Sequence, residues 1–225
     1  NNATISVAQG NTITEIHKTN MCHLGRIYRW TTLLLGMRPN EHEYKLMGLA
    51  PYAKDYIRRP AYEIFADTIA VDGIDFKWKN RPSDMFFHFK QKFERQGVRF
   101  DGIAGGLQQW VEEMLTVWVS NIMKQLGTNQ LVFSGGVAMN VKANKALADL
   151  PEVKNFFVTP SPGDESLSIG AAFVACRDKN EISPISSAYL GPAPTATQVD
   201  DALNEFSAQD KFSVCLLYTS PSPRD

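Results

Sequence analysis

Two glycines interrupt an apolar run in the stretch LVFSGGVAMNVKANK, residues 131–145. Gly135 and Gly136 follow a short apolar segment typical of a strand, and helical spacing resumes after them. Glycine lets the backbone approach a ligand that a Cβ would repel, and the N–H groups at a helix start attract anions. The stretch is typical of a phosphate-binding turn, although many α/β proteins use a Gly-Gly pair only for a tight turn.

A second candidate is PSPGDESLSIGAA, residues 160–172, which ends an apolar segment and leads into a helix of small residues. Asp164 stands where that helix begins. An Asp in this position can cap the helix, which stabilises it by about 1 kcal/mol. It can equally hold a metal ion at the carboxyl edge of a sheet, where open α/β folds bind their ligands. Position in the sequence does not separate these two interpretations.

The third candidate is EHEYKLMGLAPYA, residues 41–53, in which Glu43 and Lys45 stand two apart. They lie beside a helical pattern that ends near Gly48, with Pro51 beyond it. Lys45 has the charge to offset a phosphate, whereas an exposed charged turn is the simpler interpretation.

Hydrophobic periodicity predicts the elements that position these residues. Apolar residues recur every three or four positions from Leu107 to Ile122, so we predict a long core-packed helix over residues 102–126. Before it we predict a hairpin at 3–16, helices at 23–37 and 41–49, and a strand pair within 69–78. After it, strand, helix, strand and helix alternate at 131–133, 137–147, 155–159 and 165–176. This order indicates an α/β architecture.

Composition excludes several classes of protein. The chain has 225 residues, 44% of them hydrophobic, and a formal net charge of −1, which gives no general attraction to polyanions. It contains no apolar run of about 18 residues and no secretory signal pattern, so we expect a cytoplasmic protein. The three cysteines and four histidines lack the spacing of a disulfide framework or a metal site.

Together, EYKLMGLAPYA, FSGGVAMNVKANKAL and PSPGDESLSIGAA resemble the O-carbamoyltransferase family that includes the nodulation and tobramycin carbamoyltransferases. The resemblance spans nearly all of residues 1–192 in the family's order. HLGRIYRWTTLLLGM and IAGGLQQWVEEML are similar to the family's intervening helices, whereas His23 and Ala53 depart from its usual residues. The resemblance implies an actin-like ATPase fold of the ribonuclease H-like (ASKHA) class, similar to the threonylcarbamoyl-transfer enzyme of tRNA modification.

This resemblance implies a division of the chain. Residues 1–185 resemble the second half of the actin-like domain, and residues 186–214 resemble a linker and the start of a YrdC-like domain. The family's opening strands and its paired metal-binding histidines would lie upstream of Asn1, which we therefore expect not to be the natural start. Residues 215–225, CLLYTSPSPRD, resemble a translated sequencing adapter, and we exclude them from the fold.

The resemblance also implies a two-stage reaction. Carbamoyl phosphate and ATP give carbamoyl adenylate in the YrdC-like domain, and the actin-like domain transfers the carbamoyl group to a hydroxyl of a small-molecule or sugar acceptor. We expect a divalent metal (Fe, Mg or Mn), no nucleic-acid or membrane partner, and a homodimer as one allowed assembly. The implied site residues are Ser134, Gly135, Gly136 and Asn140 for the nucleotide, Asp164 for the metal, and Lys45 and Glu43 for catalysis.

Two other functions remain open at this stage. A threonylcarbamoyl transferase of tRNA modification shares the fold, but the KLMGLAPYA loop and the onset of a second domain at Tyr189 favour the O-carbamoyl family. A noncatalytic nucleotide-binding module of the actin-like fold is the other alternative. Whether the full gene retains the upstream histidines and the downstream domain would distinguish such a module from an enzyme.

Overall fold

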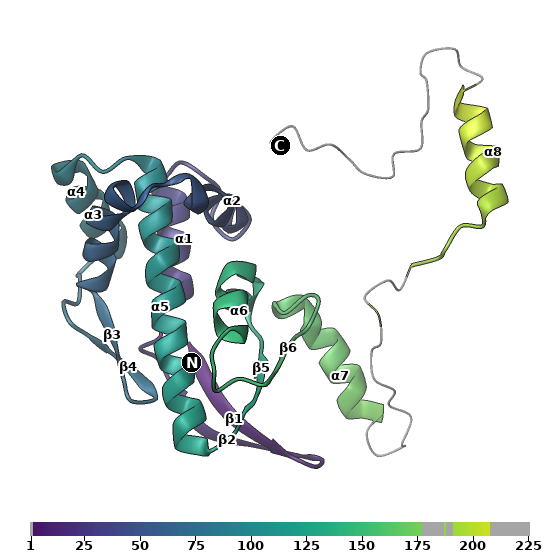
Figure 1. Ribbon diagram of the computed structural model, residues 1–225, viewed down its shortest axis with the longest axis horizontal. Helices are drawn as coiled ribbons and strands as arrows, with labels where there is room; N and C mark the ends of the chain where they lie inside the picture. The colour runs from purple at the N-terminus through teal and green to yellow at the C-terminus, as the bar shows by residue number, and fades with distance from the viewer. Residues whose placement is uncertain (1, 177–186, 188–190, 208–225) are drawn as a thin grey trace. The chain divides into compact units, whose positions relative to one another are not determined.

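The strands of the chain form three separate pairs, as a computed structural model of residues 2–176, 187 and 191–207 shows (Figure 1). Two pairs are antiparallel hairpins and the third is parallel, with Gln130 opposite Asn155 and Phe133 opposite Val158. The strands are β1 (Ala3–Gln9), β2 (Thr12–Thr19), β3 (Ile69–Asp72), β4 (Asp75–Trp78), β5 (Gln130–Phe133) and β6 (Asn155–Val158). The predicted hairpin, the strand pair and the later strands are all confirmed.

Helices alternate with these pairs along the chain, and the order of elements confirms a mixed α/β protein. The α-helices are α1 (Leu24–Leu34), α2 (Glu43–Leu49), α3 (Asp55–Ala66), α4 (Met85–Gln96), α5 (Phe100–Leu126), α6 (Val141–Ala148), α7 (Leu167–Cys176) and α8 (Ala196–Ser207). Three short 3-10 turns are η1 (Ala50–Tyr52), η2 (Gly136–Met139) and η3 (Asp164–Ser166). None of the helices in these ranges is long and apolar enough to cross a bilayer.

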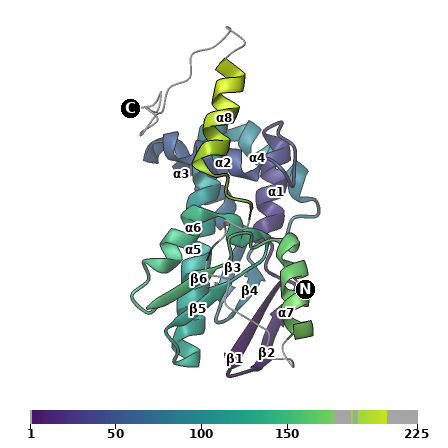
Figure 2. The same cartoon turned by 90° about the vertical axis from the view of Figure 1, so that its right-hand side faces the viewer.

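The long helix α5 forms the centre of the core, as its sequence periodicity predicts. More than half of its 27 residues are buried, and Trp110 and Trp118 pack against aromatic rings of Phe65 and Phe76. Figures 1 and 2 both show α5 running the length of the first unit, with the strand pairs and the other helices arranged around it. Helices α2 and α6 both pack against this long helix.

Three glycines let α3 and η1 approach α5 closely. A Cβ on Gly106 would lie 2.5 Å from the backbone nitrogen of Tyr62, and one on Gly102 would lie 2.5 Å from the carbonyl oxygen of Ile57. At Gly105 it would lie 2.7 Å from the Cβ of Ala53. Real Cβ atoms do not come this close to backbone, so the seam between these elements requires glycine.

One predicted helix begins later than its sequence pattern suggests. We predict a helix over 137–147, but residues 136–139 form the 3-10 turn η2, and α6 starts at Val141. The physical reason is Asn140, whose side chain accepts a hydrogen bond from the Ala143 N–H at 3.0 Å and caps α6. The loop after β5 is thus longer than predicted.

The chain divides into two units, Asn1–Glu181 and Ile182–Asp225. In the second unit the structure describes residue 187 and residues 191–207, which contain α8. Thr195 and Gln198 cap this helix reciprocally: the Thr195 hydroxyl accepts from the Gln198 N–H, and Oε1 of Gln198 accepts from the Thr195 N–H. The stretch 215–225, interpreted from the sequence as an adapter, lies outside the described residues.

The close approach of α3 to α5 predicts that two Gly→Ala substitutions differ greatly in their effect on the free energy of unfolding. Gly106→Ala should lower the free energy of unfolding by about 1–3 kcal/mol, because the new methyl group overpacks the contact with α3. Gly48→Ala, on α2, has nothing within 4 Å of its Cβ and should be neutral or stabilising. Urea unfolding followed by circular dichroism measures both. Equal stability of the two variants would show that the close approach does not constrain the fold.

Candidate functional site

The loops after β5 and β6 meet at one edge of the parallel pair. Because the two strands are parallel, their carboxyl ends lie side by side, the usual place for a ligand in an open α/β sheet. The backbone N–H of Gly135 donates to the carbonyl oxygen of Pro162 at 2.7 Å and joins the two loops. Gly135 has φ of 101°, a conformation that side chains disfavour, so the first glycine of the pair is needed for the turn itself.

A cavity of about 670 Å³ opens beside these loops. Its lining includes Gly136 and Asn140 from the first loop, Asp164 from the second, and Glu43 from α2. Residues from three separate parts of the sequence thus share one cavity. Gly25 of α1 also lines it, and a Cβ there would lie 3.2 Å from Cγ2 of Val137.

An amide network fixes Asn140 in this cavity. Gln108 of α5 is 2% exposed, and its Nε2 donates to Oδ1 of Asn140 at 3.0 Å while its Oε1 accepts from Nδ2 of Asn140 at 2.9 Å. The same Oε1 accepts from the Tyr28 hydroxyl at 3.0 Å, and Nε2 also donates to Glu112 at 2.7 Å. Asn140 is therefore held by α5 and by its own capping bond, and one Nδ2 hydrogen is left to meet a ligand.

Tyr28 keeps its proton in this network. Burial raises the pKa of the Tyr28 hydroxyl far above its ordinary value, and the nearby carboxylates of Glu112 and Glu43 raise it further. The hydroxyl consequently remains a hydrogen-bond donor to Gln108 at any physiological pH. It ties α1 to the same amide that holds Asn140.

Two arginines of α1 line the cavity, and the sequence reasoning missed both. Arg26 and Arg29 lie three residues apart, which places them on the same face of the helix. Arg29 stacks over the ring of Trp30, 4.9 Å from its centre. The signal was present in HLGRIYRW as two basic residues at helical spacing, but the sequence gives no indication that α1 faces the glycine loop.

Asp164 is not a helix cap. The turn η3 is capped at Gly163 without a side-chain bond, and Asp164 is an exposed residue of its first turn. Its neighbour Glu165 is the carboxylate that bonds to the loop, accepting from the Gly163 N–H at 3.1 Å. The capping interpretation is therefore wrong, and Asp164 lines both neighbouring cavities without a capping bond of its own.

Metal-ligand groups are incomplete around Asp164. Among residues 2–176, 187 and 191–207, no three His, Cys, Asp or Glu side chains are placed together to hold a metal ion. Asp164 fits a metal as a single carboxylate oxygen donor, and a cation there would need further ligands from outside this part of the chain.

The remaining predicted residues fall into two groups. Ser134 and Gly135 line a neighbouring, larger cavity, which Gly136 and Asp164 line as well. Lys45 lines neither cavity: it is exposed on α2, with Nζ 5.8 Å from the centre of the Tyr44 ring. Gly136 and Asp164 thus line both cavities, whereas Ser134 and Gly135 line only the larger one and Asn140 and Glu43 only the smaller one.

A profile described as the carbamoyltransferase N-terminus matches residues 3–173 of this chain. The match contains both loops, α1, α2 and the whole of α5.

Several known proteins match this chain over a limited part of their own length. A Synechocystis protein designated sll1178 is 29% identical over 87% of this chain and 35% of its own. Nodulation protein NolNO of Sinorhizobium fredii is 26% identical over 75% of the chain and 25% of its own length. Nodulation protein U of Azorhizobium caulinodans is 31% identical over 44% and 20%. The chain spans about a third of the length of the first of these relatives.

The amide network predicts a stability effect specific to Gln108. Gln108→Leu should lower the free energy of unfolding by about 2 kcal/mol, because it leaves the Tyr28 hydroxyl and the Asn140 amide without buried partners. Gln109→Leu is the matched control, since Gln109 is the next residue on α5, is half-buried and takes no part in the network. Chemical unfolding of both variants measures the difference. A Gln108→Leu variant as stable as the control would mean that the network does not hold Asn140.

Proposed function

Because the chain belongs to the carbamoyltransferase family, through the domain described as the carbamoyltransferase N-terminus, we propose that it is part of an ATP-dependent O-carbamoyltransferase. In this proposal residues 1–185 are the second half of an actin-like domain, and residues 186–214 begin a YrdC-like domain. The observation that carries the proposal is the meeting of Gly136, Asn140, Asp164 and Glu43 at one cavity beside the ends of two parallel strands.

The proposed reaction transfers a carbamoyl group in two stages. Carbamoyl phosphate is hydrolysed to carbamate and inorganic phosphate, and a carbamate oxygen attacks the α-phosphorus of ATP, so that pyrophosphate leaves and carbamoyl adenylate forms. Its carbamoyl carbon carries AMP as a good leaving group. A hydroxyl oxygen of a small-molecule or sugar acceptor attacks that carbon, the bond to the adenylate oxygen breaks, and AMP departs. The acceptor's proton passes to a base. Carbamoyl transfer needs this activation because carbamate itself is a poor electrophile.

The cavity offers groups suited to an adenylate. The N–H of Gly135 is bound to Pro162, so Gly136 is the glycine whose backbone can approach a phosphate. Arg26 and Arg29 supply positive charge at the same cavity, and Asn140 supplies one amide hydrogen. Lys45 lies outside the lining, so its part is limited to longer-range attraction of the phosphate.

Glu43 is the carboxylate suited to act as the base. Its Oε1 accepts from the Asn40 N–H at 2.7 Å, which fixes the side chain and leaves Oε2 to accept a proton. Asn40 has φ of 67°, a left-handed conformation that Asn tolerates better than most residues. The turn before α2 thus orients Glu43 toward the cavity.

Asp164 would hold a divalent cation with ligands from outside the described residues. Such a cation would neutralise phosphate charge when bound. Two observations support this role. Asp164 lines the cavity, and its carboxylate does not cap the helical turn that follows Gly163.

In the complete enzyme, Asp164→Asn should lower metal content and the rate of carbamoyl transfer while leaving the melting temperature unchanged. Asn keeps an oxygen but loses the charge that holds a cation. Asp149→Asn is the control, because Asp149 pairs with Lys145 on the exposed side of α6 and lines neither cavity. Metal analysis and a carbamoyl-transfer assay give the readouts. Unchanged metal content and rate in Asp164→Asn would end the metal assignment.

Residues 1–225 alone should transfer no carbamoyl group, because the chain spans about a third of the length of its relatives and so would lack most of the adenylate-forming part. The assay mixes the purified chain with carbamoyl phosphate, ATP and a panel of hydroxyl acceptors, with mass spectrometry for carbamoylated products. Transfer by the isolated chain would contradict the proposed division of labour.

A further inference from the structure

The loop that connects α1 to α2 is closed on itself by one residue, His42. The backbone N–H of Arg38 donates to Nδ1 of His42 at 3.1 Å, and the carbonyl oxygen of Arg38 accepts from the His42 N–H at 2.9 Å. His42 therefore bonds to both backbone groups of a residue four positions before it. Its ring and its main chain together hold the two ends of the segment 38–42.

The imidazole of His42 turns back to this loop and not forward to the helix that it precedes. His42 stands at the N-cap position of α2, yet its side chain makes no capping bond there. A backbone N–H can only donate, so Nδ1 presents a lone pair to Arg38, and in the neutral ring the proton is on Nε2. The ring meets the Tyr44 ring edge-on, with 6.3 Å between their centres.

Glu43, the next residue, makes a second side-chain bond to the same loop. Its Oε1 accepts from the Asn40 N–H at 2.7 Å, and Asn40 lies midway between Arg38 and His42. The φ of 67° at Asn40 is a left-handed conformation, which a residue other than glycine keeps only where its surroundings hold it. The donor that fixes Glu43 is therefore available only while the loop stays folded.

The imidazole is the side chain best placed to keep the loop folded. Another side-chain contact within the loop is the ion pair between Arg38 and Glu41, at 3.0 Å, but both residues are exposed. Exposed ion pairs contribute little, because water screens them and two long side chains must be ordered. His42 is half-buried, and it bonds to the backbone itself.

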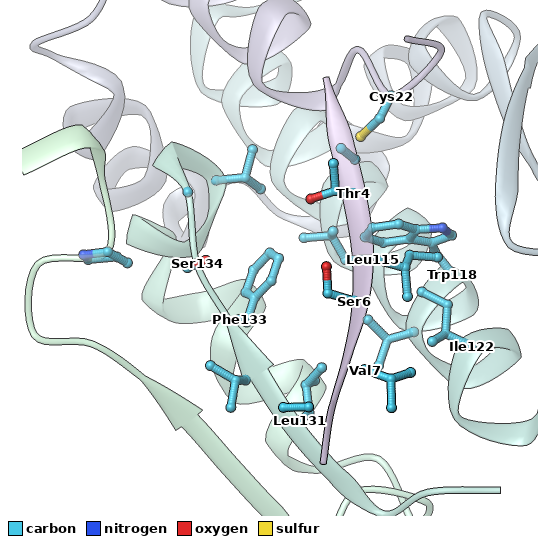
Figure 3. A pocket seen from close by; sticks show the side chains of 18 of the residues that line it. Thr4, Ser6, Val7, Cys22, Leu115, Trp118, Ile122, Leu131, Phe133 and Ser134 are labelled. Atoms are coloured by element: carbon cyan, nitrogen blue, oxygen red, sulfur yellow. The ribbon is translucent and has the colours of Figure 1, made fainter. Parts of the chain in front are cut away.

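The loop lines the smaller cavity through the neighbours of His42. Its lining includes Asn40, Glu41, Glu43 and Tyr44. Arg38 and His42 line neither cavity, and the larger cavity, shown in Figure 3, is lined by none of residues 38–44. A change in the fold of the loop would thus alter the smaller cavity, and His42 would act on it only through other residues.

We propose that His42 is a positioning residue for Glu43. Its Nδ1 holds the segment 38–42 folded, and the folded loop presents the Asn40 N–H that fixes the Glu43 carboxylate at the cavity. The consequence for catalysis rests on the proposed function, in which Glu43 is the base, because a base acts only within hydrogen-bond reach of the proton that it takes. The placement of Glu43 by the loop does not depend on any reaction.

Three substitutions in the complete enzyme separate the contributions to this placement. His42→Ala removes the acceptor. His42→Asn keeps one, because Oδ1 of Asn is as many bonds from the backbone as Nδ1 of His. Arg38→Ala is the matched control, since it removes the ion pair with Glu41 but keeps the N–H and the carbonyl oxygen that bond to His42. Thermal melting of each variant followed by circular dichroism shows whether the fold is kept.

Hydrogen–deuterium exchange resolved to single amides is the first readout. The Asn40 and Arg38 amides should exchange about fivefold faster in His42→Ala, a factor that corresponds to the loss of a typical hydrogen bond. In His42→Asn and Arg38→Ala both amides should exchange at nearly the wild-type rate. This measurement needs no substrate and reports on the placement of Glu43 directly.

Steady-state kinetics of carbamoyl transfer is the second readout. His42→Ala should lower kcat by about 10- to 100-fold with little change in the KM for the nucleotide, because a misplaced base affects the transition state and not the binding of ATP. His42→Asn should restore most of kcat, and Arg38→Ala should leave it unchanged.

Three outcomes would overturn the proposal. The first is an Asn40 amide that exchanges equally fast in wild type and His42→Ala. The second is an unchanged kcat in His42→Ala although that amide exchanges faster. The third is a loss in His42→Asn as large as in His42→Ala, since the acceptor would then not matter. A wild-type enzyme that transfers no carbamoyl group would contradict the proposed function instead, and the exchange rates would then decide alone whether His42 places Glu43.

Discussion

The close approach of α3 to α5 is the constraint on which the other features of the first unit depend. Gly102, Gly105 and Gly106 bring the backbones of these helices within distances that no larger residue permits. Two residues beyond the last of these glycines, α5 presents Gln108, whose buried amide reaches Tyr28 on α1 and Asn140 in the glycine loop. Packing between helices thus determines the position of a side chain at the cavity, through a single amide.

Sequence pattern predicts the elements that obey a simple period and misses those that do not. The apolar stripe from Leu107 to Ile122 predicts a helix with nearly the bounds of α5. A helix buried along its length has to repeat apolar residues at this spacing. Helix α3 received no assignment, and it contains Pro60, a residue that usually ends a helical pattern. The late start of α6 escaped prediction because Asn140 acts through a local side-chain bond that has no periodic signature.

For the candidate site, the sequence predicted the strand ends well, and long-range placement poorly. The sequence predicts that Gly136 and Asp164 lie close together, because neighbouring parallel strands end at the same edge of a sheet. Which face of α1 or α2 turns toward that edge depends on tertiary packing. For that reason Arg26 went unrecognised, and Lys45 was included although it lies outside the cavity. The roles of these residues in chemistry stay proposals, whereas their positions follow from the fold.

Hydrogen–deuterium exchange of the complete protein, with and without saturating AMP, tests most directly whether the cavity at the ends of β5 and β6 holds the nucleotide. The account predicts slower exchange in peptides covering residues 134–141 and 160–167, and no change in peptides covering β2 or α4, which lie away from the cavity. Protection confined to other parts of the protein, with these two loops unchanged while AMP is bound, would contradict it.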